Sequence, residues 1–182
     1  MESRAKLVGH AVHPMLIVFP LGLLGMAAIF DLIYLGSGNR DLATASYWMI
    51  AAGVITGLLA AVFGFWDWLA LPGGTRAKGV GLLHGGGNVV VVGLFIVAWL
   101  IRLNARVGDV AYAPNGLPIV LEVIALLLAL VSGWLGGELV ERLGVGVDEG
   151  AHLQAPNSLS GKPARAGTER TATPAPPRAA SA

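Results

Sequence analysis

The residues best suited to chemistry in this sequence are histidines and carboxylates near the ends of long apolar runs. His10 and His13 precede one such run, and His84 lies early in another. In a chain without cysteine, imidazole and carboxylate groups suit iron, zinc or manganese as ligands. Imidazoles from two helices can also be the axial ligands of a b-type haem. A metal or haem site is therefore the first functional hypothesis.

Membrane-spanning helices are the elements that must position these residues. Of the 182 residues, 55% are hydrophobic and only 13% are charged, about half the charged share of a soluble domain. A spanning helix needs about 20 mostly apolar residues, and four runs meet this requirement: residues 14–35, 46–71, 79–101 and 117–140. The sequence predicts an all-α fold, a four-helix transmembrane bundle in residues 1–143.

The ends of the runs carry their own signals. Pro20 lacks an N–H and frees the carbonyl of Leu16, so a kink is expected there. Glycines end the first run, and Arg40 and Asp41 are expected in a short wet turn. From Gly144 onward the chain is rich in Pro, Ala, Ser, Thr and Arg. Such a segment buries too little apolar surface to fold, so residues 144–182 are predicted to be a disordered cytoplasmic tail.

An even number of spans places both termini on one side of the membrane. Basic residues near the spans are somewhat more frequent on that side, which predicts cytoplasmic N and C termini. The same topology brings a set of metal-binding residue types to the cytoplasmic level of the bundle: His10, His13, Asp67, His84 and Glu138. Asn88 lies one turn beyond His84 on the same helix face and is expected to support it.

A structural role is the alternative for these residues, because ionisable groups near a membrane interface cost little free energy. Asp67 would then pair with Arg76 or Lys78, and Glu138 with Arg142. The glycines that follow His84 would serve helix packing alone.

On the opposite face, Asp31 and Arg102 are predicted to form an ion pair between the first and third helices. A proton or ion path through Asp31 and Glu122 is the functional alternative. Such a path needs ionisable groups at mid-depth, and the runs contain none there. A small transporter is therefore disfavoured.

The sequence lacks the signatures of several other classes. A net charge of +1 does not favour binding to nucleic acid. No nucleophile–histidine–acid order, phosphate loop or nucleotide fingerprint is found, which favours a non-enzymatic protein. Small residues recur at helical spacing in the second and fourth runs, as at Gly53, Gly57, Gly133 and Gly137. Such faces can pack against a partner or a second copy of the chain.

Several motifs together resemble one protein family. The residues concerned are Gly9-His10, His13-Pro14-Met15-Leu16, Phe19-Pro20, Asp31 to Tyr34, Tyr47 to Gly53, Asp67-Trp68-Leu69, Gly73, Thr75 to Ala77, Gly81 to His84, Asn88 and Gly136 to Val140. From about Leu7 to Val147 the chain resembles a bacterial family of predicted membrane proteins, the domain of unknown function 2231. The resemblance implies a four-span protein of the bacterial inner membrane.

The resemblance also bears on the site. Members of that family are sometimes joined to, or encoded beside, redox proteins such as Rieske-type iron–sulfur domains, which implies a redox protein partner. Many members carry a further histidine at the position where this chain has Val18. A ligand set carried over from the family therefore rests on His10, His13 and His84.

The leading functional hypothesis is a non-enzymatic redox module in the lipid bilayer, with haem b or a non-haem metal ion at its cytoplasmic face. His10, His13 and His84 would bind the cofactor, with Asp67 and Glu138 as additional ligands in the metal alternative. The competing hypothesis is a structural or interaction protein of the membrane that holds no cofactor.

Overall fold

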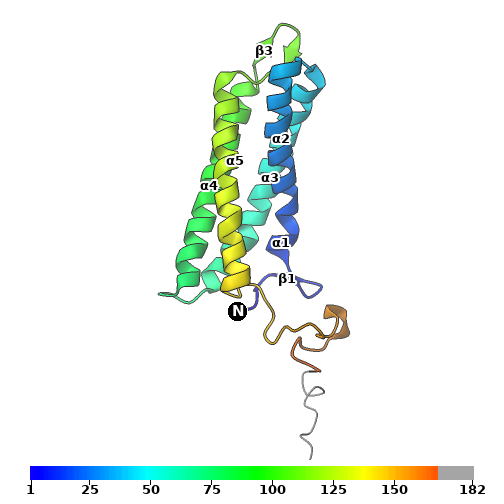
Figure 1. The fold of residues 1–182 in the computed structure, drawn as a ribbon, viewed down its shortest axis with the longest axis vertical. Helices are drawn as coiled ribbons and strands as arrows, with labels where there is room; N and C mark the ends of the chain where they lie inside the picture. The colour runs from blue at the N-terminus through cyan, green and yellow to red at the C-terminus, as the bar shows by residue number, and fades with distance from the viewer. Residues whose placement is uncertain (168–182) are drawn as a thin grey trace, which may run out of the picture.

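Long helices standing side by side make up the molecule (Figure 1). The computed structural model describes residues 1–167; the remainder of the predicted tail, residues 168–182, lies outside the described part. The elements in chain order are β1 (Lys6–Leu7), β2 (His10–Ala11), α1 (Val12–Leu16), α2 (Val18–Ser37), α3 (Arg40–Ala70), α4 (Arg76–Arg102), β3 (Arg106–Val107), β4 (Val110–Ala111) and α5 (Gly116–Gly137). A π-helical turn, Glu138–Arg142, extends α5, and Ser158–Ser160 form a short 3-10 turn.

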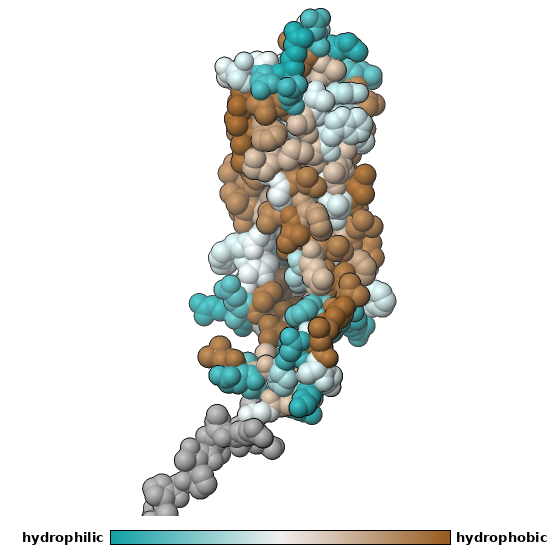
Figure 2. Space-filling model, turned by 90° about the vertical axis from the view of Figure 1, so that its right-hand side faces the viewer, coloured by the Kyte–Doolittle hydropathy of each residue, from teal (hydrophilic) through white to brown (hydrophobic). Residues whose placement is uncertain are grey.

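The predicted all-α bundle is confirmed. Helical segments 12–37, 40–70, 76–102 and 116–142 are each long and apolar enough to cross a membrane. Most of their large apolar side chains face outward instead of into the bundle. Figure 2 shows the resulting hydrophobic band, with hydrophilic residues gathered at both ends. A lipid bilayer is the environment in which such a surface is stable.

Two helices begin earlier than the hydrophobic runs predict. Asn39 caps α3, because its side-chain oxygen accepts a hydrogen bond from the backbone N–H of Asp41 at 3.0 Å. Thr75 caps α4 in the same way through the N–H of Lys78 at 3.2 Å. These caps satisfy N–H groups that a helix start leaves free. Arg40 and Asp41 consequently lie in the first turn of α3 and not in a connecting loop.

The first spanning segment is interrupted at Ile17. Here α1 ends and α2 begins, although the backbone stays in the right-handed helical region. Pro20 has no N–H to donate to the carbonyl of Leu16. The break therefore lies where the kink was expected.

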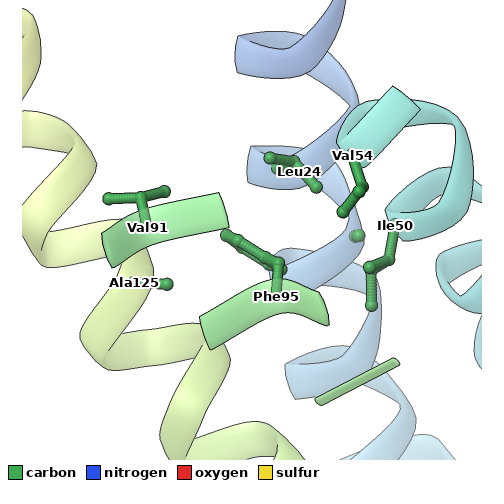
Figure 3. Close-up of a cluster of buried hydrophobic side chains, with 7 residues drawn as sticks. Leu24, Ile50, Val54, Val91, Phe95 and Ala125 are labelled. Carbon is green, nitrogen blue, oxygen red and sulfur yellow. The ribbon is translucent and has the colours of Figure 1, made fainter. Parts of the chain in front are cut away.

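Two helix pairs make up the bundle. Helix α2 packs along α3, α4 packs along α5, and contacts between α3 and α4 join the two pairs. The core at mid-height is small and entirely apolar (Figure 3), with Leu24, Ala27, Ile50, Val54, Val91, Phe95 and Ala125 as its buried members. This dry layer separates the polar groups at one end of the bundle from those at the other.

The two ends carry different structures (Figure 1). The β3–β4 hairpin covers one end. The other end carries the β1–β2 hairpin and residues 144–167. The segment from Gly144, predicted to be disordered, has a defined course as far as residue 167. The amino group of Met1 donates to the carbonyl of Gly144 at 2.9 Å, and the Lys6 ammonium pairs with Asp148. These contacts depend on the folded N-terminal hairpin, which composition alone does not predict.

Candidate functional site

Two histidine rings meet at the end of the bundle that carries the termini. His13 comes from α1 and His84 from α4, and we call them the histidine pair. Their ring centroids are 6.4 Å apart, and the ring planes are nearly perpendicular, at 88°. Both side chains are half-buried. The pair arises because α1 and α4 both begin at this end of the bundle.

A backbone carbonyl orients the ring of His13. Its Nδ1 lies 2.8 Å from the carbonyl oxygen of Ala60 in α3. A carbonyl oxygen can only accept, so Nδ1 carries the proton and the neutral ring keeps Nε2 free of hydrogen. The ring rests on Gly64 of the same helix, where an added Cβ would lie only 2.8 Å from the imidazole. Glycine at this position lets the ring approach the backbone of α3.

His84 is held in the same tautomer from α5. Its Nδ1 donates to the carbonyl of Ser132 at 2.8 Å. Its Nε2 lies 3.2 Å from the amide nitrogen of Asn88, so that the amide donates and Nε2 accepts. Asn88 is one helical turn along α4, the supporting position predicted from the sequence. Both members of the histidine pair therefore present an unprotonated Nε2.

The three other predicted ligands, His10, Asp67 and Glu138, each have partners other than the histidine pair. His10 is exposed on β2, with Nε2 3.4 Å from the hydroxyl of Ser158. Asp67 has its two oxygens 2.9 and 2.7 Å from the Ser3 hydroxyl, and it accepts the N–H of Arg4 at 2.8 Å. No group of three or more His, Asp or Glu side chains positioned to bind a metal ion occurs within residues 1–167.

The expected salt bridges of these carboxylates also differ from those observed. Glu138 pairs with Arg76 of α4 and not with Arg142, which is only four residues away in the sequence. Lys78 donates to the carbonyl of Trp68 at 2.7 Å and lies over the same indole ring, so it does not pair with Asp67. Depth along the helices predicted the correct end of the bundle for these carboxylates, but their partners come from other segments: Ser3 and Arg4 bond Asp67, and Arg76 pairs with Glu138.

A second polar site lies at the opposite end and is fully buried. Arg102 donates to both oxygens of Asp31, to Glu122 at 3.2 Å and to the hydroxyl of Ser46 at 2.7 Å. We call these four residues the Arg102 cluster. Its members come from α4, α2, α5 and α3, so one guanidinium connects all four spanning segments. The sequence predicted Asp31 with Arg102, and the structure adds Glu122 and Ser46 to the pair.

Backbone and aromatic groups complete the surroundings of Arg102. Its guanidinium also donates to the carbonyls of Ala43 at 2.9 Å and Tyr112 at 3.0 Å. The ring of Tyr112 stacks on that of Tyr47, with centroids 4.0 Å apart. Buried charges need such complete hydrogen bonding to be tolerated. No sequence motif marked Ser46 or the two tyrosines as partners of Arg102.

Comparison with known protein families identifies the chain. Residues 9–149 match the family described as predicted membrane protein, DUF2231. The chain belongs to this family. The DUF2231 match covers all the spanning helices, the histidine pair and the Arg102 cluster, and it ends within the segment that follows α5. No curated protein and no solved structure matches the chain. As a DUF2231 member with four apolar helices of spanning length within residues 1–167, it is a membrane protein.

Proposed function

We propose that this DUF2231 protein is a non-enzymatic membrane module that holds a transition-metal centre through the histidine pair. The observation that carries the proposal is the matched hydrogen bonding of the rings: each Nδ1–H is donated to a backbone carbonyl, at Ala60 and Ser132. Metal-binding histidines almost always donate their other N–H in this way, which fixes the tautomer and leaves Nε2 as the ligand atom. His13 and His84 are the proposed ligands.

The separation of the rings supports a shared metal. Two imidazoles whose nitrogens lie about 2.0–2.1 Å from one metal have centroids about 6.5 Å apart when they bind on opposite sides of it, and less when they bind at a smaller angle. The observed separation is 6.4 Å. Since no third His, Asp or Glu joins the pair among the described residues, it suits a centre that takes two protein ligands. A haem b iron meets this condition, as does a single metal ion whose other positions are filled by water.

Electron transfer is the role that fits such a centre. Iron changes its oxidation state, in haem or as a single ion, whereas zinc bound to the same imidazoles would not. The histidine pair is half-buried close to one end of the bundle, within reach of a redox protein partner docked at that end. His10, Asp67 and Glu138 have no part in the proposed ligand set, because their side chains are engaged elsewhere.

One observation favours a second function, that of a structural or interaction protein without a cofactor. His84 is fully hydrogen-bonded as it stands, because Ser132 accepts from Nδ1 and Asn88 donates to Nε2. A buried imidazole satisfied in this way also stabilises the contact between α4 and α5.

Absorption spectra and metal analysis of the purified full-length protein test the proposal. Haem gives a visible band that shifts on reduction with dithionite, whereas a bound ion without haem appears in the metal analysis at one per chain. Either signal should disappear in His13→Ala and His84→Ala and remain in His10→Ala, the matched control on the exposed β2 strand. A protein with neither haem nor stoichiometric metal, or a signal retained in His84→Ala, would refute the proposal.

We also infer that both termini face the cytoplasm. Arg4, Lys6, Arg76 and Lys78 lie at the terminus end, with Arg142 in the turn after α5. At the other end Arg102 is buried in its cluster, which leaves Arg40 and Arg106 as the exposed basic residues near the spans. This distribution supports the orientation. A reporter that works only in the cytoplasm should be inactive when fused after Gly108 in the β3–β4 hairpin, and an active fusion there would reverse the orientation.

A further inference from the structure

The Arg102 cluster contains more acidic groups than basic ones. Its single cation, Arg102, faces two carboxyl groups, Asp31 and Glu122, and each of the three side chains is at most 1% exposed. If both carboxyl groups were ionised, the cluster would carry one uncompensated negative charge. An unpaired charge in a low-dielectric interior is strongly unfavourable, and such a group takes up a proton instead.

The hydrogen bonds differ sharply between the two carboxyl groups. Asp31 receives Nη1 and Nη2 of Arg102 and also the hydroxyl of Ser46. Among the described residues, Glu122 receives a single N–H, from Nη1 of Arg102 at 3.2 Å on Oε1. Its Oε2 is buried with no hydrogen-bond partner among the described residues. Asp31 therefore has the surroundings of a carboxylate, and Glu122 those of a neutral acid.

The groups that face the carboxyls from each packed element do not supply a second cation. Helix α2 contributes Asp31, α3 contributes Ser46 and Tyr47, and α4 contributes Arg102. The segment before α5 contributes the carbonyl of Tyr112, which accepts from Arg102. Of these, only the guanidinium is positively charged.

We propose that Glu122 is a proton-binding site: in the folded protein it is a protonated carboxylic acid, while Asp31 is the carboxylate that neutralises Arg102. The proton makes the cluster electrically neutral inside the bundle. The apolar core shown in Figure 3 begins one turn further along α5, at Ala125. The histidine pair lies at the other end of the bundle. The proton is thus held at one end of the bundle, and none of the buried core residues named above for mid-height is ionisable.

Infrared spectroscopy of the full-length protein in lipid nanodiscs at neutral pH tests the proposal. A protonated carboxyl group has a carbonyl stretching band well separated from the bands of carboxylates. Biosynthetic labelling with side-chain carboxyl ¹³C identifies its residue type, without any substitution. The band should be present in the unsubstituted protein and should shift with labelled glutamate and not with labelled aspartate. The absence of the band, or a shift with labelled aspartate, would overturn the proposal.

Substitution then identifies the glutamate. Glu122→Gln, a neutral side chain of the same shape, should lose the band and keep the thermal stability of the unsubstituted protein. Glu141→Gln, on an exposed glutamate of the turn after α5, is the matched control and should keep the band. If Glu122→Gln does not accumulate, Glu122→Asp replaces it, and the band should then respond to labelled aspartate. A band that persists unchanged in the Glu122 variant, or one that is lost from Glu141→Gln, would contradict the assignment.

Discussion

His13 lies directly against Gly64, so closely that a methyl group at position 64 would be 2.8 Å from both Cε1 and Nδ1 of the imidazole. This contact, with the hydrogen bond to Ala60, fixes the ring on the surface of α3. The position of one half of the histidine pair thus depends on a residue that has no side chain.

Gly64→Ala is expected to displace the imidazole of His13. Overpacking of this kind costs about 1–3 kcal/mol, and it should weaken the hydrogen bond to Ala60 and abolish the proposed metal binding. Gly57→Ala, two turns away in α3, is the matched control, because its Cβ would make ordinary contacts of 3.5 and 3.6 Å. Thermal unfolding in detergent and the metal content of both variants check the prediction. Equal stability and equal metal content would contradict it.

Asn88→Ala separates the proposed metal site from a purely structural histidine. The variant loses the amide that donates to Nε2 of His84, at a cost of about 1 kcal/mol. In the metal-binding protein Nε2 is the ligand atom, so the bound metal or haem should remain. Thermal unfolding and the metal content of the purified variant decide between the two roles of His84. Retained metal with unchanged stability indicates a ligand, and lost stability in a metal-free protein indicates a structural histidine. Ser132 still accepts from Nδ1 by its backbone in this variant, so the tautomer is unchanged.

Arg102→Met is expected to be the most damaging of these substitutions. It leaves Asp31 and Glu122 buried without a cation, and the loss of one partner from a buried ion pair costs about 3–5 kcal/mol. Arg40→Met is the control, because Arg40 pairs with Asp109 at 3.5 Å on the exposed surface. An exposed ion pair of this kind contributes about 0–1 kcal/mol to the free energy of unfolding. Denaturant or thermal unfolding should show this difference. A similar small loss in both variants would show that the Arg102 cluster does not hold the bundle together.

The docking of residues 144–167 on the N-terminal hairpin should depend on pH. Glu2 accepts the backbone N–H of Glu149 at 3.2 Å, which ties it to the docked segment. The hydrogen bonds from Lys6 and from the N–H of Glu149 lower the pKa of Glu2, and the hydrogen bond to Asp148 raises the pKa of Lys6. Ionised Glu2 stabilises the docking fully above its free-chain pKa, and this stabilisation is lost as the pH falls through the lowered value. Protonated Lys6 stabilises the docking fully below its free-chain pKa, and this stabilisation is lost as the pH rises through the raised value. Docking is therefore tightest between these limits.

Spin labels measure this docking directly. The chain has no cysteine, so cysteines introduced at Leu7 and Leu153, both exposed, carry the only labels. The distance distribution should be narrow at neutral pH and broader in acid, in strong alkali and in high salt. Lys6→Gln should broaden it at neutral pH. A distribution that is constant over the whole pH range would show that Glu2 and Lys6 do not control the docking.

The sequence by itself determined the spanning helices and the level of their polar groups. Long apolar runs form helices in a bilayer, because each backbone N–H and C=O must be hydrogen-bonded within its own segment. Strict alternation of direction then placed His13 near His84, and Asp31 near Arg102. The helix starts at Arg40 and Arg76 were missed because side-chain caps, rather than hydropathy, set them.

Only the tertiary structure decided which polar groups at one level make contact. Depth along a helix does not specify the direction in which a side chain points. It also does not specify which of several donors at that depth bonds a given carboxylate. Ser3 and Arg4 fold back onto Asp67, and Arg76 reaches Glu138, so neither carboxylate joins the histidine pair. Glu122 lies against Arg102 because the packing of α4 along α5 turns both side chains to the same interior. Helix rotation and packing, which depend on the whole bundle, set these contacts.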